Sequence, residues 1–281
     1  QLTAALSSTA TIKDVYGNVM TNRAAAIDNV ISKNIVIDNA KPVANFSAPL
    51  EGSFVNKGEV KFTLSEELSS ATLSFRATSS ENGETAGTAH ELALNGAELA
   101  TLGEQAKEVA GLVNGNTYTL SLRGTDIAGN VSDGADSQVT GITFDTRKPE
   151  GSLEGPAAIE GKVYFNEDAD IKVTADEILR TNASGENQQE KSYLKFTNVQ
   201  NSQETVCTFS EQLIALFPAE DHALDFGTDC GGMTLGEGEY ALSLHLIDRA
   251  GNGKDIEQTG FVYDVTAPRV FSFTSSTDNT C

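Results

Sequence analysis

Aspartate and asparagine recur at a fixed spacing in a pentapeptide that could hold a cation. Asp-x-Ala-Gly-Asn occurs at Asp126–Asn130 and at Asp248–Asn252, and a degraded copy lies at Asp14–Asn18. Carboxylate and amide oxygens are calcium ligands, but calcium takes about six to eight oxygens and each pentapeptide supplies one Asp and one Asn. The alternating carboxylates of an EF-hand loop are absent, which excludes that motif.

The pentapeptide also has a purely structural interpretation. Glycine permits the positive φ that a tight turn needs, and Asp and Asn side chains cap backbone donors in turns. On this interpretation each copy forms the hairpin between the last two strands of a repeated unit. Both interpretations stay open at this stage.

Further acidic residues are expected near the ends of the repeated units. Asp145 and Asp264 each stand four residues before a proline, and the pairs Glu66–Glu67 and Asp176–Glu177 follow strand-like segments. If the acidic turns reach the pole where one unit meets the next, their carboxylates repel one another unless a cation neutralises them. The alternative is that they are solvated loop residues. The candidate calcium ligands are Glu66, Glu67, Asp126, Asn130, Asp145, Asp176, Glu177, Asp248, Asn252 and Asp264.

Cysteine and histidine offer little other chemistry. Cys207 and Cys230 fall in the same unit and could form a disulfide, which would imply an oxidising compartment, or remain buried thiols. The histidines, His90, His222 and His245, have no Cys, Asp or Glu at metal-ligand spacing. No nucleophile elbow or phosphate-binding loop occurs either, so we predict that the chain is not an enzyme.

Charge and hydropathy exclude other classes. The formal net charge of −21 argues against binding to nucleic acid or to an anionic membrane surface. No apolar run is long enough for membrane insertion. An acidic surface suits a self-repelling soluble protein or one that collects cations.

The elements that carry these residues repeat along the chain. Asp-x-x-x-Pro occurs at Asp38–Pro42, Asp145–Pro149 and Asp264–Pro268, at a spacing close to the size of one small β-sandwich. We therefore predict Ig-like domains at 42–149 and 150–268, flanked by partial units at 1–41 (closing strands) and 269–281 (opening strand).

Within each unit the apolar residues alternate as they do in half-buried strands. Val60–Leu68 corresponds to Ile171–Leu179, and Tyr118–Leu122 corresponds to Tyr240–Leu246. About seven strands per unit are expected, which predicts an all-β fold of tandem immunoglobulin-like β-sandwiches arranged as a rod. Short helical turns are possible at 97–112 and 210–217, and 181–191 is expected to be a long loop. The expected core includes Phe62, Leu64, Phe75, Tyr118, Leu120, Val173, Phe196, Tyr240, Leu242 and Leu244.

Taken together, these motifs resemble the bacterial immunoglobulin-like repeats of large secreted adhesins and surface proteins. The resemblance rests on the Tyr-x-Leu strand, Asp-x-Ala-Gly-Asn, the terminal Asp-Thr-x-x-Pro and Ser65–Leu68 with its looser copy Ala175–Ile178. It implies a non-catalytic extracellular stalk segment, with calcium at acidic junctions that stiffens the rod.

Two alternatives remain open. A fibre-forming surface subunit would polymerise head to tail, with the strand at 269–281 completing the partial unit at 1–41 of the next copy. A ligand-binding accessory module of a secreted enzyme is the other. The expected partners are neighbouring repeats or identical subunits, and a host or cell-surface protein or glycan.

Overall fold

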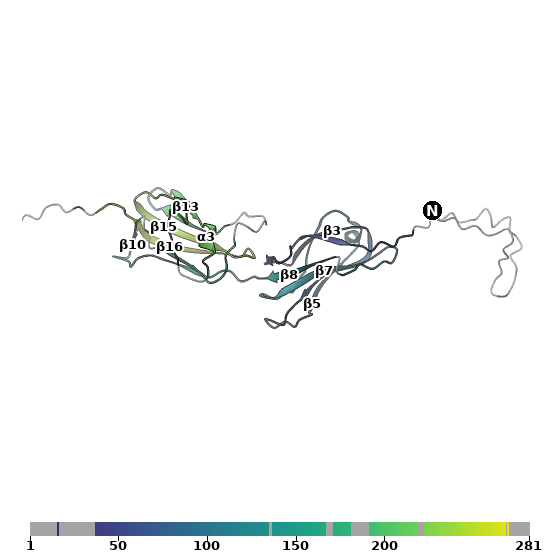
Figure 1. Cartoon of the computed structure of the whole chain (residues 1–281). Helices are drawn as coiled ribbons and strands as arrows, with labels where there is room; N and C mark the ends of the chain where they lie inside the picture. Colours follow the sequence, from purple (N-terminus) through teal and green to yellow (C-terminus); the bar gives the residue numbers. More distant parts are fainter. Residues whose placement is uncertain are drawn as a thin grey trace, which may run out of the picture.

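The computed structural model describes residues 16, 37–134, 137–166, 171–180, 191–218, 222–267 and 269. The predicted partial units at the two ends fall almost wholly outside these residues, as does most of the loop predicted at 181–191. The described residues form two units, each with its own sheets and its own hydrophobic core. Figure 1 shows them as separate groups of strands.

The first unit consists of two antiparallel-rich sheets. The smaller has the order β1-β3-β6 and the larger β2-β8-β7-β4-β5. Only the short pairing of β2 with β8 is parallel. The strands are β1 (Ala44–Ala48), β2 (Phe54–Val55), β3 (Glu59–Leu64), β4 (Leu68–Ala77), β5 (Ala89–Leu94), β6 (Gln105–Glu108), β7 (Thr117–Asp126) and β8 (Gln138–Phe144).

The second unit repeats this plan. Its sheets have the orders β14-β11-β9 and β10-β16-β15-β12-β13, again with one parallel pair, β10 with β16. The strands are β9 (Gly151–Glu154), β10 (Val163–Phe165), β11 (Lys172–Ala175), β12 (Tyr193–Asn198), β13 (Glu204–Thr208), β14 (His222–Ala223), β15 (Gly238–Ile247) and β16 (Gly253–Tyr263).

The observed architecture confirms the all-β prediction and refines it. Counting only the described residues, each unit has eight strands rather than about seven, because two-residue strands such as β2 and β14 carry no alternating pattern that the sequence could show. The helix expected in 97–112 is limited to α2 (Ala97–Ala100), and the segment then extends into strand β6. The second expected helical turn is α3 (Glu211–Ile214), and the Ser210 Oγ accepts a hydrogen bond from the Leu213 N–H, as predicted for an N-cap.

Alternating burial along the strands builds both cores. In β7 the side chains of Tyr118, Leu120 and Leu122 point inward and their neighbours outward, and β15 repeats the pattern. All ten residues that the sequence placed in the core are buried. The sandwich is held by these inward faces because burying a large apolar side chain stabilises the fold by about 1.5–3 kcal/mol.

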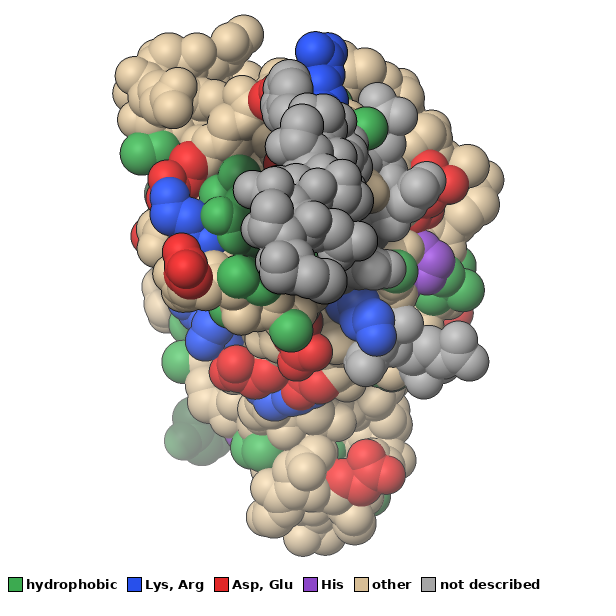
Figure 2. Space-filling view, turned by 90° about the vertical axis from the view of Figure 1, so that its left-hand side faces the viewer, with side chains coloured by type: hydrophobic (Ala, Val, Ile, Leu, Met, Phe, Trp, Pro, Cys, Tyr) green, Lys and Arg blue, Asp and Glu red, His purple; other side chains and the backbone are tan. Residues whose placement is uncertain are grey.

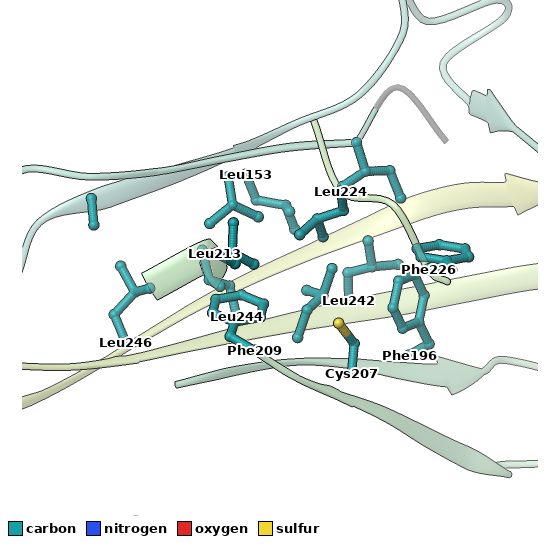
Figure 3. Close-up of a cluster of buried hydrophobic side chains, with 14 of the residues drawn as sticks. Leu153, Phe196, Cys207, Phe209, Leu213, Leu224, Phe226, Leu242, Leu244 and Leu246 are labelled. Carbon is teal, nitrogen blue, oxygen red and sulfur yellow. The ribbon is translucent and has the colours of Figure 1, made fainter. Parts of the chain in front are cut away.

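The core of the second unit is drawn in Figure 3. Leu242, Leu244 and Leu246 of β15 face Leu153 of β9, and α3 adds Leu213 to the same cluster. Cys207, on β13, points into the same cluster and forms a disulfide with Cys230, with the two Cα atoms 4.6 Å apart. The bond ties β13 to the loop that follows β14.

The surface is mixed in charge. On the end of the second unit drawn in Figure 2, single basic side chains are interspersed among acidic ones and do not gather into one area. Within the described ranges both helices are single turns, and neither could cross a bilayer.

The disulfide should contribute measurably to stability. Replacing both Cys207 and Cys230 by alanine should lower the free energy of unfolding by about 2–4 kcal/mol, because the bond restricts the unfolded chain. Urea unfolding of the double variant against wild type measures the difference. Cys281→Ala leaves the bond in place and serves as the control. Equal stability of the double variant and the control would contradict the expectation.

Candidate metal centre

Each Asp-x-Ala-Gly-Asn pentapeptide forms the turn that closes the hairpin between the last two long strands of its unit. The Asp126 Oδ1 accepts the N–H groups of Gly129 and Asn130 at 2.6 and 2.8 Å, and its Oδ2 accepts the Asn130 Nδ2 at 2.8 Å. Gly129 has φ of 98°, which favours glycine. Asp126 is 2% exposed, so its hydrogen bonds replace the water it has lost.

The second copy has the same geometry. The Asp248 Oδ1 accepts the Asn252 N–H at 2.8 Å, and its Oδ2 accepts the Asn252 Nδ2 at 2.7 Å. Gly251 has φ of 90°. The structural interpretation of the pentapeptide is therefore correct for both copies. Whether a cation could bind nearby depends on the residues that surround each turn.

The asparagine of each turn also holds the segment that enters the unit. The Asn130 Nδ2 donates to the Asp38 carbonyl at 3.1 Å, and the Asn252 Nδ2 donates to the Asp145 carbonyl at 2.9 Å. One amide group thus joins the turn carboxylate to the aspartate of Asp-x-x-x-Pro. This contact places the linker aspartate beside the buried carboxylate of the turn.

A third segment is fixed by the residue that follows the first long strand of the small sheet. The Ser65 Oγ accepts the Val43 N–H at 2.9 Å, and the Asp176 Oδ1 accepts the Glu150 N–H at 2.8 Å. In both units the same residue returns a backbone hydrogen bond, from Ser65 to Val43 and from Asp176 to Glu150. The next residue in each case is a glutamate that faces the linker aspartate.

These three constraints assemble one cluster of carboxylates in each unit. The first acid cluster is Asp38, Glu66 and Asp126, and the second acid cluster is Asp145, Glu177 and Asp248. Within each cluster, one oxygen of each residue lies within 4.8 Å of the others. Equivalent positions in two copies of the repeat therefore meet in the same way.

The structure brings together five of the ten residues predicted as ligands, Glu66, Asp126, Asp145, Glu177 and Asp248. Asn130 and Asn252 lie beside the clusters but present amide donors to them. Glu67 is exposed and belongs to neither cluster. Asp176 is engaged with Arg147.

Asp264 belongs to no such group among the described residues, and its Oδ1 accepts the Thr266 N–H at 2.9 Å. Asp38 is a cluster member that the predicted ligand set lacks. The signal for it was present, because Asp38 and Asp145 occupy the same position of Asp-x-x-x-Pro.

Crowding changes the protonation of the clusters. Desolvation, followed by repulsion from Asp248 and Asp145, raises the pKa of Glu177 to about 7, although Arg147 partly offsets it. Desolvation and the charges of Asp38 and Asp126 raise the pKa of Glu66. Desolvation also raises the pKa of Asp248, whereas hydrogen bonds from Asn130 and the turn outweigh desolvation and lower the pKa of Asp126.

One oxygen of the second cluster has no hydrogen-bond donor. The Glu177 Oε1 is buried and makes no hydrogen bond, and the Arg147 Nη2 lies 3.5 Å away. A buried carboxylate oxygen without a donor is costly, since desolvation is not repaid. Glu177 also lies in one cluster with the carboxylates of Asp145 and Asp248, so the chemistry of the donor set fits a hard cation.

Comparison with known proteins gives likeness of fold only. No family model and no curated protein matches the sequence. Similar solved structures include fibronectin(III)-like modules of CbhA from Clostridium thermocellum, at 11% identity and TM-score 0.35, covering 78% of this chain and 92% of that one. A tetra-tandem repeat from the extending region of a large adhesion protein matches at 14% identity and TM-score 0.29, over 80% of this chain and 50% of that one.

A third is a Ca²⁺-stabilized adhesin with which an Antarctic bacterium binds ice, at 12% identity and TM-score 0.31, covering 90% of this chain and 55% of that one. The chain thus spans about half the length of the two adhesin structures. At these values the likeness concerns the β-sandwich type, and the proposals below rest on the residues of this chain.

Glu177 should make stability depend on pH when no metal is supplied. Its pKa is raised from 4.5 to about 7 in the folded protein, so the folded state holds a proton that the unfolded state has lost. Stability therefore falls as pH rises through this window. Urea unfolding at a series of pH values from 5 to 8, in chelator, should show the decline in wild type and a flatter profile in Glu177→Gln. Glu67→Gln is the matched control, and an unchanged slope in Glu177→Gln would contradict the assignment.

Proposed function

We propose that this chain is a non-catalytic structural repeat segment of an extracellular bacterial surface protein, an adhesin or stalk, whose units are tied end to end by calcium at the acid clusters. The observation that carries the proposal is the recurrence of the cluster at the same place in both units. A cluster built twice from the same turn, linker and glutamate is a feature of the repeat and not an accident of an acidic surface.

The position of the second cluster is suited to stiffening a junction. Asp145 directly follows β8 of the first unit, and its N–H donates to the Val55 carbonyl of that unit at 2.9 Å. Glu177 and Asp248 belong to two separate turns of the second unit. A cation bound by all three residues would therefore hold the end of one unit against the beginning of the next. This would restrict bending about residues 145–150.

The donor set fits calcium. A cation that binds its ligands at about 2.3–2.6 Å keeps opposite ligand oxygens about 4.6–5.2 Å apart, which is compatible with the spacing of the carboxylates. When bound, the ion would supply positive charge that removes their mutual repulsion. Water or further oxygens would complete the coordination, because calcium takes about six to eight ligands.

Other contacts support a restricted junction. The Arg249 guanidinium, in the turn of the second unit, lies 3.9 Å from the ring centroid of Phe54 in the first unit. Lys254 pairs with Glu150 at 3.4 Å. Together with the hydrogen bond from Asn252 to Asp145, these contacts support a rod-like array of sandwiches.

The disulfide supports an extracellular location, since such bonds persist in oxidising compartments. The partners proposed for such a segment are neighbouring repeats or identical subunits. A role in adhesion would place a host or cell-surface ligand elsewhere along the array.

Calcium should stabilise the protein and make it less flexible. At a calcium concentration about a hundredfold above Kd, the free energy of unfolding should rise by about 3 kcal/mol for each site. Glu66→Gln and Glu177→Gln should each remove one site, whereas Glu67→Gln should remove none. Calorimetric titration counts the sites, and small-angle X-ray scattering with and without chelator measures the maximum dimension. Failure of wild type to bind calcium, or retention of both sites in the Gln variants, would overturn the proposal.

A further inference from the structure

The two acid clusters differ in one residue of the linker. Behind each linker aspartate the backbone adopts the same small turn, in which the N–H two residues on donates to the aspartate Oδ1. This bond runs from Ala40 to Asp38 and from Arg147 to Asp145, each at 2.9 Å. Positions 40 and 147 are therefore structurally equivalent, and only the second carries a charged side chain.

Arg147 reaches the second acid cluster from its outer side. The Nη1 donates to the Asp176 Oδ2 at 2.6 Å, and the Nη2 lies 3.5 Å from the Glu177 Oε1, the same oxygen that has no hydrogen-bond donor. A guanidinium cannot lose its charge near neutral pH. The second cluster thus has a permanent cation beside the carboxylate that a metal would use.

The first cluster has no such cation among the described residues. Within the part of the chain that the structure describes, no ion pair involves Asp38, Glu66 or Asp126, and Lys41, the basic residue in the linker, pairs instead with Asp133 at 3.5 Å. The position of Asp176, which orients Arg147, is occupied by Ser65 in the first unit. The arginine and the aspartate that holds it therefore occur together in one unit and are both replaced in the other.

From this difference we infer that Arg147 is a tethered counter-ion that competes with metal for Glu177. The second junction is therefore held partly without calcium, whereas the first cluster depends on calcium. The inference rests on the proposed calcium function. It predicts that the two clusters respond differently when the calcium concentration falls. The carboxylates of the first cluster separate, while those of the second remain held together.

The test uses the full chain in a Glu66→Gln background, so that calcium binding reports the second cluster alone. Arg147→Ala should increase calcium affinity roughly tenfold at low salt, because a positive charge a few ångströms from the ligand is removed. Lys148→Ala, which removes a charge one residue away, and Arg147→Lys, which keeps the charge, should stay close to the background. Calorimetric titration measures all three variants.

A paired substitution separates local contact from net charge. Asp176→Ser together with Arg147→Ala reproduces the residues of the first unit and leaves the formal charge unchanged. Affinity should still rise, because the guanidinium lies 3.5 Å from the Glu177 Oε1 and its charge acts on Glu177 more strongly than that of Asp176 does. An affinity for Arg147→Ala equal to that of Lys148→Ala would overturn the inference.

A second readout needs no metal. In chelator at pH 8, Arg147→Ala should lower the unfolding midpoint, whereas Lys148→Ala should not, because Glu177 then loses the guanidinium that lies 3.5 Å from its Oε1. If wild type binds no calcium, the proposed function fails while this arm still tests the role of Arg147. If wild type binds calcium and the calcium affinities of Arg147→Ala and Lys148→Ala are equal, the inference alone fails.

Discussion

The buried carboxylate in each Asp-x-Ala-Gly-Asn turn is the group on which the rest of the site depends. An ionised carboxylate taken out of water is unstable unless donors surround it. Asp126 and Asp248 obtain those donors from the turn itself, which closes the hairpin between the last two strands. The asparagine that completes the turn then has an amide proton left for the linker, and so the Asp and Asn of each turn fix both the hairpin and the chain that enters the unit.

The structure contains a second kind of buried acid, and the contrast explains what the cluster glutamates do. Glu84 accepts hydrogen bonds from the Tyr118 hydroxyl at 2.5 Å and the Asn116 amide at 2.6 Å, and it also contacts His90. These donors outweigh desolvation and lower its pKa. Its role is to anchor a loop to the core. Glu177 is only half-buried, but its Oε1 has no such donor and two like charges lie nearby, so its pKa shifts the opposite way. An acid in that position suits a cation that arrives from solution.

The two units show how a repeat can vary the charge beside its acid cluster without changing its fold. Backbone geometry at Ala40 and Arg147 is the same, because the aspartate two residues earlier shapes it. The side chain there is free to vary. One position thus tunes the charge of a junction while the sheets, the turn and the linker remain constant. On the calcium binding proposed above, such substitutions would give each junction its own sensitivity to calcium.

The sequence by itself determined the fold type, the hairpin turns and most of the cluster. Alternating apolar residues such as Tyr118 and Leu120 bury one face of a strand. Asp145 and Asp248 each have a counterpart in an equivalent sequence context, which marks them as parts of a repeated structural unit. These features are local or periodic, so they can be recognised in the amino-acid sequence alone. The two-residue strands were missed because they have no period to detect.

What only the tertiary structure decided is which acids meet. Glu66 and Glu67 are adjacent in sequence, but in the turn between β3 and β4 Glu66 joins Asp38 in the cluster while Glu67 is exposed. Asp176 and Glu177 separate in the same way, one toward Arg147 and one into the cluster. Which side of a turn each residue occupies follows from the register of the sheets and from the hydrogen bonds that Ser65 and Asp176 make to the linker. These contacts join segments more than twenty residues apart, and no local pattern encodes them.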